Sequence, residues 1–200
     1  MDSSGTYKDG NLNGKWTYWN ENGQKRSEKK YKDGVPDGKW TEWSGGEGDP
    51  NDYSGAFPYH KSYEETYKDG SLDGLHTEWN ENGQKRIQKI YKNGIEIEWT
   101  EWEYYDNGQK KSEGTLKDGE LDGLWTIWYE NGQKKVEVTF KNGKLHGVST
   151  VWYENGQKGA EETWKDGKED GKWTDWYENG QKGAEVTWKD GKQIGKIKRF

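Results

Sequence analysis

Pairs of aspartates four residues apart, each beside a glycine, have the spacing in this chain that most suggests chemistry. Three such pairs are Asp69 and Asp73, Asp118 and Asp122, and Asp166 and Asp170. Carboxylate oxygens at a repeated spacing could bind a hard cation such as Ca²⁺. Aspartate and glycine are also the residues that tight turns prefer, because the aspartate side chain can accept a hydrogen bond from its own backbone. Turn formation explains the pairs with fewer assumptions, so we predict turns at these positions.

Other polar residues give no stronger signal for catalysis or metal binding. Residues 49–52, Asp-Pro-Asn-Asp, lack the spacing and the distal bidentate glutamate of a calcium-binding loop. The three histidines, His60, His76 and His146, stand in unrelated contexts, with no nucleophile or carboxylate repeating around them. We therefore predict no catalytic residue, no metal site, no cofactor and no enzymatic activity.

The composition limits the kind of fold and partner. Only 27% of the residues are hydrophobic and the mean hydropathy is −1.49, which is too polar for a thick two-layer core, yet the chain has 14 Trp and 13 Tyr. The net charge is −6, and lysines alternate with acidic residues, so no basic stripe is available for nucleic acid or an anionic membrane. We expect an ordered chain that uses aromatic residues where other proteins use aliphatic ones.

The chain has no cysteine and no apolar stretch of transmembrane length. We therefore expect a soluble protein as given, with no transmembrane segment. The compartment stays open, because the protein could be cytoplasmic, or secreted after removal of a signal peptide.

A repeat places the aromatic and turn residues. Asn-Gly-Gln-Lys occurs six times, starting at residues 22, 82, 107, 131, 155 and 179, and Lys-Asp/Asn-Gly occurs eight times. The last four copies of Asn-Gly-Gln-Lys are 24 residues apart, a period typical of repeat architectures. Asn-Gly between runs of Trp, Thr, Tyr and Val predicts β-hairpins. We predict an all-β fold over a single domain, residues 1–200: an elongated, twisted, single-layer antiparallel β-meander of about eight 24-residue hairpins, about 16 strands and no helices.

The turn chemistry decides which residues share a face of the sheet. A two-residue Asn-Gly turn would pair Trp125 with Val138. A type I turn with Gly132 in a left-handed bulge would pair Trp128 with Lys134, and would group Leu124, Thr126 and Trp128 with Val136, Val138 and Phe140. We favour the bulged register, because the Thr126 and Trp128 positions are nearly invariant between repeats whereas the Ile127 position is mostly charged. The Thr-x-Trp side should then be the packed face.

The opposite face should be an open aromatic surface where a partner binds. Its predicted residues are Trp16, Trp40, Trp99, Trp125, Tyr129, Tyr153, Trp173 and Tyr177. These rings could instead supply the core of a thin sheet, since each tryptophan buries a large area. They could also stack against sugars or quaternary amines.

An insert interrupts the second repeat at residues 44–66, where Asn-Gly-Gln-Lys is missing and about twelve residues are extra. A long aromatic loop on a regular scaffold is a candidate for position-specific binding, through Tyr53, Phe57, Tyr59 and His60. The alternative is a tolerated surface excursion without function.

Residues 128–147, WYENGQKKVEVTFKNGKLHG, resemble the bacterial variant of MORN repeats, the type found in YwqK-family antitoxins. The resemblance covers nearly the whole chain apart from the insert, and it implies a β-meander that serves as an interaction scaffold, with no catalytic residues. We therefore predict a non-enzymatic scaffold for protein–protein interaction. The alternatives are an antitoxin or immunity protein that neutralises a toxin, and a surface module for carbohydrate or choline-type ligands.

Two departures from the repeat pattern are notable. Repeat four reads Ile-Glu-Ile-Glu-Trp at residues 95–99, without the usual Asp-Gly, and should hold a bulge or kink. His76 and Ser149 replace tryptophan at the Trp125 position. The exposed edges of an open sheet would also allow edge-to-edge self-association.

Overall fold

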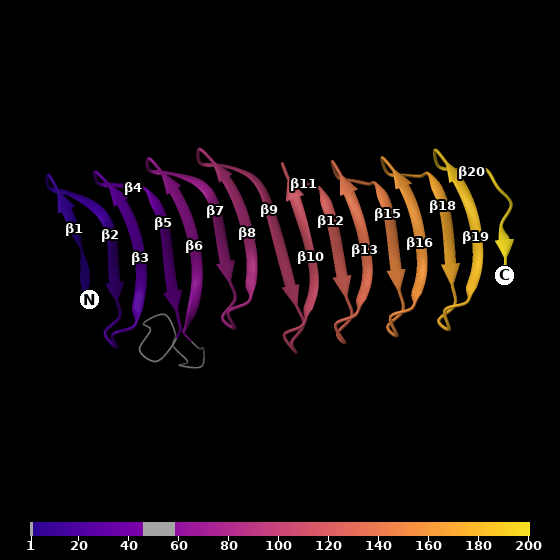
Figure 1. Ribbon diagram of the computed structural model, residues 1–200, viewed down its shortest axis with the longest axis horizontal. Helices are drawn as coiled ribbons and strands as arrows, with labels where there is room; N and C mark the ends of the chain where they lie inside the picture. The colour runs from indigo at the N-terminus through magenta and orange to yellow at the C-terminus, as the bar shows by residue number, and fades with distance from the viewer. Residues whose placement is uncertain (1, 46–58) are drawn as a thin grey trace. The chain divides into compact units, whose positions relative to one another are not determined.

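A computed structural model describes residues 2–45 and 59–200 (Figure 1). Tyr53 and Phe57 of the predicted insert site lie outside these ranges. All regular structure in the described residues is β-strand, and no helix occurs among them. The chain divides into two compact units, residues 1–99 and 100–200. The predicted all-β meander is confirmed.

The first unit is an antiparallel meander in which each long strand pairs with the next long strand along the chain, from β1 to β8, while the two-residue β4 pairs with β3. The strand β9, Ile95–Tyr104, contains the boundary between the units, within the irregular fourth repeat. The strands are β1 Ser3–Lys8, β2 Asn11–Trp19, β3 Lys25–Lys32, β4 Val35–Pro36, β5 Gly38–Ser44, β6 His60–Lys68, β7 Ser71–Trp79 and β8 Lys85–Lys92.

The second unit repeats the same antiparallel pattern, with a two-residue segment leading into each first strand of a hairpin. Its strands are β10 Lys110–Lys117, β11 Glu120–Leu121, β12 Gly123–Trp128, β13 Lys134–Lys141, β14 Lys144–Leu145, β15 Gly147–Trp152, β16 Lys158–Lys165, β17 Lys168–Glu169, β18 Gly171–Trp176, β19 Lys182–Lys189, β20 Lys192–Gln193 and β21 Lys198–Arg199. With each short segment counted together with the strand that it leads into, the two units hold the predicted number of strands.

The Lys-Asp/Asn-Gly sequences form tight two-residue turns. Asp118 and Gly119 both have positive φ, 50° and 81°, between the paired residues Lys117 and Glu120. Two successive positive φ angles define a type I′ turn, whose twist matches that of the strands, and aspartate, asparagine and glycine adopt it at the lowest steric cost. The equivalent residues have positive φ in all eight repeats.

The Asn-Gly-Gln-Lys sequences form the bulged turn. Gly132 has φ of 84° and its N–H donates to the Tyr129 carbonyl (2.9 Å), while the Tyr129 N–H donates to the Gln133 carbonyl (2.8 Å). Trp128 pairs with Lys134, as the bulged register predicts. The glycine is required because a type I turn followed by a left-handed residue has little room for a Cβ.

The predicted grouping of side chains is nevertheless wrong for the second strand of the hairpin. Ile127 pairs with Val136, so Lys135 is an extra, unpaired residue, and beyond it Trp125 pairs with Val138. One extra residue in a strand exchanges its two faces. Val136, Val138 and Phe140 therefore lie on the face of Trp125 and Ile127, whereas Thr126 pairs with Glu137.

Two faces can now be defined. The Thr face carries the Thr126 position of each repeat, and these threonines are only 5–8% exposed: Thr17, Thr41, Thr77, Thr126, Thr150 and Thr174. The aromatic face carries the Trp125 position, where Trp16 is the one buried hydrophobic side chain among the described residues, at 7% exposure. No large side chain among them is fully buried. Each unit is therefore a single layer with two partly exposed faces, and the predicted burial of the threonine row is confirmed.

Lysines bridge neighbouring hairpins on the Thr face. Lys110 Nζ lies 5.1 Å from the centre of the Trp128 ring and 2.6 Å from Glu113, and Lys134 lies 5.8 Å from the ring of Trp152. Each exposed cation–π contact contributes about 0.5–1 kcal/mol. Because the lysine and the tryptophan belong to successive repeats, these contacts add to the hydrogen bonds that hold the hairpins side by side.

On the aromatic face, a missing side chain makes room for a tryptophan. A Cβ on Gly114 would lie 1.9 Å from Cε3 of Trp125, and a Cβ on Gly5 would lie 2.2 Å from Cδ2 of Trp16. Gly114 is buried under the Trp125 ring that crosses it. These two tryptophans can lie flat on the sheet only because the strand before them has glycine at that point.

We expect Gly114→Ala to lower the free energy of unfolding by about 1–3 kcal/mol, because the Trp125 ring must move off the sheet. Gly195→Ala is the matched control, since its Cβ would lie 3.8 Å from the nearest atom, an ordinary contact, and its cost should stay within about 0.5 kcal/mol. Urea unfolding followed by circular dichroism measures both. Equal costs at the two glycines would contradict the flat seating of Trp125.

Candidate functional site

The aromatic face of the first unit carries several groups of contacting rings. The Trp16 ring lies 5.0 Å from the ring of Tyr7, and the Trp40 ring lies 5.3 Å from Tyr31 and 4.7 Å from Tyr67. Their indole N–H groups are satisfied, because Trp16 donates to the Thr6 carbonyl (3.1 Å) and Trp40 donates to the Lys30 carbonyl (3.0 Å). Here the rings support one another and the strand below them.

Two tryptophans of this unit are each covered by a lysine of the chain. Lys29 Nζ lies 4.8 Å from the centre of the Trp40 ring and 2.9 Å from a carboxylate oxygen of Glu42. Lys89 Nζ lies 6.0 Å from the Trp99 ring and 2.7 Å from Glu96. Each ammonium group is thus held between a ring and a carboxylate of the aromatic face.

The second unit differs at its last repeats, where the aromatic face is hollowed. The rings of Trp164, Trp173 and Trp188 form a cluster with centre-to-centre distances of 5.4 and 5.2 Å. Beside Trp173 lies a hollow of about 260 Å³, with Ala160 and Ala184 among its lining residues. The indole N–H groups of Trp173 and Trp188 are buried and have no hydrogen-bond partner within residues 100–200. We name this hollow the Trp173 pocket.

A second hollow adjoins the Trp173 pocket. It has a volume of about 290 Å³, shares Asp175 and Ala184 with the first, and is also lined by Tyr153, Tyr177 and Arg199. The first hollow thus lies beside the indole of Trp173 and the second beside the phenol ring of Tyr177.

The predicted tryptophans are on the aromatic face, but they are less exposed than an open surface would make them. Trp40, Trp99, Trp125 and Trp173 are half-buried, and Trp16 is buried. The alternative that these rings supply the core of a thin sheet therefore describes part of their role. What remains exposed is the outer surface of each ring.

The three predicted tyrosines differ in their contacts. Tyr129 donates its hydroxyl to the Trp152 carbonyl (2.8 Å), and Tyr153 donates to the Trp176 carbonyl (2.9 Å), so both join their turn to the following repeat. Tyr177 is 58% exposed, and its hydroxyl forms no hydrogen bond within residues 100–200. The regular 24-residue spacing of the turns could have indicated that these tyrosines join one repeat to the next.

The described ends of the insert belong to strands. Ser44 ends β5, and residues 60–66 lie in β6, where Lys61 pairs with Trp43 as Lys134 pairs with Trp128. The insert predicted at 44–66 therefore leaves the register of the repeat unchanged. Tyr59 donates its hydroxyl to the Lys25 carbonyl, and His60 lies half-buried opposite Ser44.

The aspartate pairs take part in turn geometry. Asp118 is the first left-handed residue of its turn, while Asp122 accepts the Asn142 N–H of the next turn (3.1 Å). Asp73 likewise accepts the Asn93 N–H (3.2 Å) and binds Lys92 (3.0 Å), whose hydrogen bond lowers the pKa of the Asp73 carboxyl. No group of three or more metal-binding side chains occurs in residues 2–45 and 59–200.

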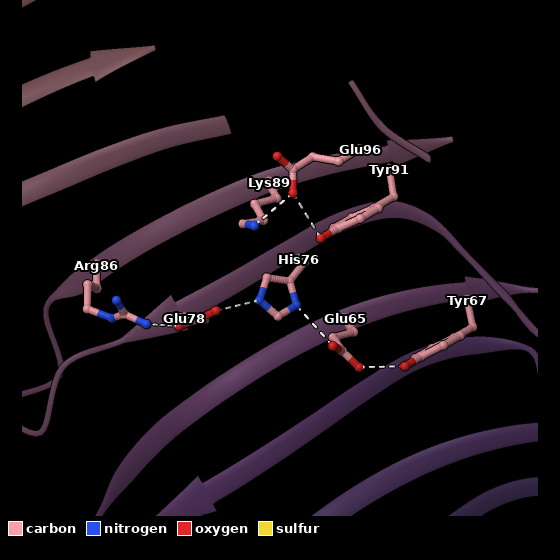
Figure 2. Close-up of polar contacts among 8 residues, drawn as sticks. All are labelled: Glu65, Tyr67, His76, Glu78, Arg86, Lys89, Tyr91 and Glu96. Atoms are coloured by element: carbon pink, nitrogen blue, oxygen red, sulfur yellow. Dashed lines mark hydrogen bonds and ion pairs between the residues drawn. The ribbon is translucent and has the colours of Figure 1, made fainter. Parts of the chain in front are cut away.

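Sequence reasoning missed a polar network around His76 (Figure 2). Nδ1 of His76 lies 3.0 Å from Glu65, and Nε2 lies 3.0 Å from Glu78, which also binds Arg86. Tyr67 donates to the second oxygen of Glu65 (2.7 Å). The replacement of tryptophan by histidine, with glutamates at the two flanking positions of the same face, was the signal that could have indicated it.

The network shifts the pKa of His76 and of the two glutamates that bind it. The hydrogen bond to Glu65, followed by that to Glu78, raises the pKa of His76 above its usual range although burial opposes the shift, and the side chain is only 13% exposed. The hydrogen bond from His76 lowers the pKa of Glu65. Burial raises the pKa of Glu78, but His76 and Arg86 outweigh it, so the net shift is downward. The two carboxylates therefore stabilise the charged form of His76 relative to the neutral form.

We expect Tyr129→Phe to lower the free energy of unfolding by about 0.5–1.5 kcal/mol, because the Trp152 carbonyl loses its hydroxyl donor. Tyr177→Phe is the matched control, and its effect should stay within about 0.5 kcal/mol. Urea unfolding of the two variants measures the difference. If both variants matched the unsubstituted protein, the hydroxyl of Tyr129 would not be joining the repeats.

His76 should make stability depend on pH. Its pKa is raised in the folded state, so its contribution is fully present below the unfolded pKa of about 6.5 and is lost as the pH rises through the folded pKa. The stability advantage over His76→Gln should thus shrink between pH 6 and pH 9. The contribution of Glu65, whose pKa is lowered, disappears only as the pH falls through its folded pKa. A difference in unfolding free energy that did not change above pH 6 would exclude this coupling.

Comparison with known protein families identifies the repeat. The model of the MORN repeat variant matches six segments, which together cover more than half of the chain: residues 12–33, 72–93, 100–118, 121–142, 145–166 and 169–190. No curated protein matches the chain. MORN repeats are generally modules that interact with proteins or membranes and are not known as enzymes. Among the described residues, no helix is long and apolar enough to cross a bilayer. The chain therefore belongs to the MORN repeat variant family.

Proposed function

We propose that this chain is a non-enzymatic repeat scaffold that binds another protein through the aromatic face of its sheets. The observation that carries the proposal is the absence of a second layer over that face in the described residues, where Trp16 alone among the hydrophobic side chains is buried. A face of half-exposed aromatic rings next to charged groups has the composition of a protein interface, where tryptophan, tyrosine and arginine carry most of the binding energy.

The shape of the face also favours a protein partner. The hollows beside Trp173 and Tyr177 measure about 260 and 290 Å³, below the roughly 300 Å³ at which typical small-ligand pockets begin. Shallow hollows of this size accept single side chains of a partner. The net charge of −6 favours a partner with a basic surface over an anionic membrane or nucleic acid.

The described insert residues Tyr59 and His60 would add specificity at one end of the hairpin formed by β5 and β6. A toxin is one kind of protein that such a scaffold could mask, and the antitoxin role is a narrower form of the same proposal. The identity of the partner would distinguish an antitoxin from a general scaffold, because an antitoxin must cover the active surface of its toxin.

Two valines on β15 provide a matched test of which face is used. Val151 lies on the aromatic face, paired with Ala160, and is 36% exposed, whereas Val148 lies on the Thr face and is 50% exposed. Val151→Glu should weaken partner binding by roughly tenfold or more, since it places a charge in an apolar contact. Val148→Glu should leave the affinity unchanged.

The measurement has two steps. The partner is captured from native cells with the unsubstituted chain and identified by mass spectrometry, and the affinity of the purified partner is then measured by calorimetry for both variants. A partner lost with Val148→Glu and retained with Val151→Glu would reverse the assignment of the faces. Cosedimentation of the chain with vesicles, without any captured protein, would argue against a protein-binding scaffold.

A further inference from the structure

The Trp173 pocket occupies the place that a lysine fills in the first unit. At Trp40, the lysine on the preceding strand, Lys29, covers the ring, and Glu42, two residues after the tryptophan, binds its ammonium group. Lys89 covers Trp99 from the equivalent position of its repeat. The fold therefore uses one arrangement at these tryptophans, with an ammonium group between an indole ring and a carboxylate.

The strand pairing identifies the same three positions at Trp173. Ala160 pairs with Asp175 as Ser27 pairs with Glu42, so Asp175 occupies the position of Glu42. Two residues further along the preceding strand, Glu162 stands where Lys29 stands in the first unit. The ring and the carboxylate are retained at Trp173, but the lysine is replaced by a second acid.

No cation of the second unit takes the place of the missing lysine. Within residues 100–200, no lysine or arginine lies over the Trp173 ring, and neither Glu162 nor Asp175 forms an ion pair. Glu162 accepts a hydrogen bond from the Trp164 indole (3.3 Å), and Asp175 accepts one from the Ala184 backbone N–H. Both acids line the Trp173 pocket.

Small residues open the space above the ring. Residues 158–160 and 182–184 both read Lys-Gly-Ala, where the other repeats have Lys-Arg-Ser, Lys-Ser-Tyr, Lys-Arg-Ile, Lys-Lys-Ser or Lys-Lys-Val. Ala184 stands where Tyr63 stands beside Trp40, and Ala160 and Ala184 both line the pocket. The volume of about 260 Å³ holds n-butylammonium, whose five non-hydrogen atoms need about 150 Å³ at the roughly 30 Å³ of one water molecule each.

We propose that the Trp173 pocket binds an external aliphatic ammonium group, such as the end of a lysine side chain. The ring face supplies cation–π attraction, and Glu162 and Asp175 supply the negative charge that Glu42 supplies to Lys29. This inference depends on the pocket alone and does not require the protein-binding function proposed above. A lysine of a partner and a free amine would bind in the same way.

A titration with n-butylammonium chloride, at constant ionic strength, tests the site through the indole N–H signals of the whole chain in ¹H–¹⁵N NMR spectra. The Trp173 signal, assigned by its loss in Trp173→Phe, should shift and saturate. Nα-acetyl-lysine amide should produce the same shift, because it presents the same group. n-Butanol, which has the same number of non-hydrogen atoms without the charge, should bind at least roughly tenfold more weakly, as expected for a desolvated cation–π contact.

Glu162→Lys is the decisive variant, because it restores the lysine found at Trp40 and should abolish the shift with n-butylammonium. The matched control is Glu178→Lys, an identical change of charge at an exposed turn residue, which should retain the shift. Asp175→Asn should weaken binding without filling the pocket. Circular dichroism and the unchanged signals of the other indoles verify that each variant is folded.

Three results would overturn the proposal. Equal shifts with n-butanol and n-butylammonium would show an apolar hollow with no preference for a cation. Equal loss in Glu162→Lys and Glu178→Lys would show an effect of net charge alone. Saturable binding of glucose or cellobiose, with no shift from either amine, would assign the ring to sugar stacking instead.

Discussion

The structure depends on one constraint: each hairpin lies in a single-layer sheet and can bury its side chains only against the hairpins next to it. Thr126 and its equivalents are the best-buried row, and yet no large side chain among the described residues is fully buried. Stability must therefore come from contacts that cross from one repeat to the next. The Lys134–Trp152 contact, the Tyr129 hydroxyl on the Trp152 carbonyl and the Asp122 carboxylate on the Asn142 N–H are all of this kind. The 24-residue period follows, because these contacts recur only when successive hairpins have the same length.

The same constraint separates the roles of the two faces. On the Thr face the lysine and the tryptophan recur in almost every repeat, so that face is occupied by contacts of the chain itself. On the aromatic face the residues vary from repeat to repeat, with Trp125, Ser149 and Trp173 at one position of successive hairpins. Variation is tolerated there because a ring that loses its neighbour still lies on the strand below. The aromatic face can thus acquire local features such as the His76 network and the Trp173 pocket without loss of the repeat.

Much of the fold could be predicted from the sequence, because turn chemistry is local. Asp118-Gly119 and the bulged turn at Gly132 follow from residues that tolerate positive φ, and their spacing gives the strands. Which side chains of the second strand lie on the same face as Trp125 could not be predicted in the same way. Whether Lys135 or another residue is left unpaired depends on the pairing of the whole strand, and the sequence near the turn fits either outcome. The polar contacts of His76 were missed for a related reason, since Glu65 and Glu78 meet it only after the register of three strands is fixed.

Residues at equivalent positions of successive repeats therefore have to be compared with one another to explain a local feature of this chain. Lys29, Lys89 and Glu162 are far apart in the sequence and look unrelated there. The pairing of β3 with β5 and of β16 with β18 places Lys29 opposite Trp40 and Glu162 opposite Trp173, and Lys89 lies 6.0 Å from the centre of the Trp99 ring. In a globular core such a change from lysine to glutamate would be compensated by neighbours from several directions. In a single layer only the neighbouring strands can respond, and here β18 carries Asp175 and β19 carries Ala184, which add charge and space instead of a counterion. Because no lysine or arginine within residues 100–200 lies over the Trp173 ring, the arrangement that is complete at Trp40 lacks its ammonium group at Trp173.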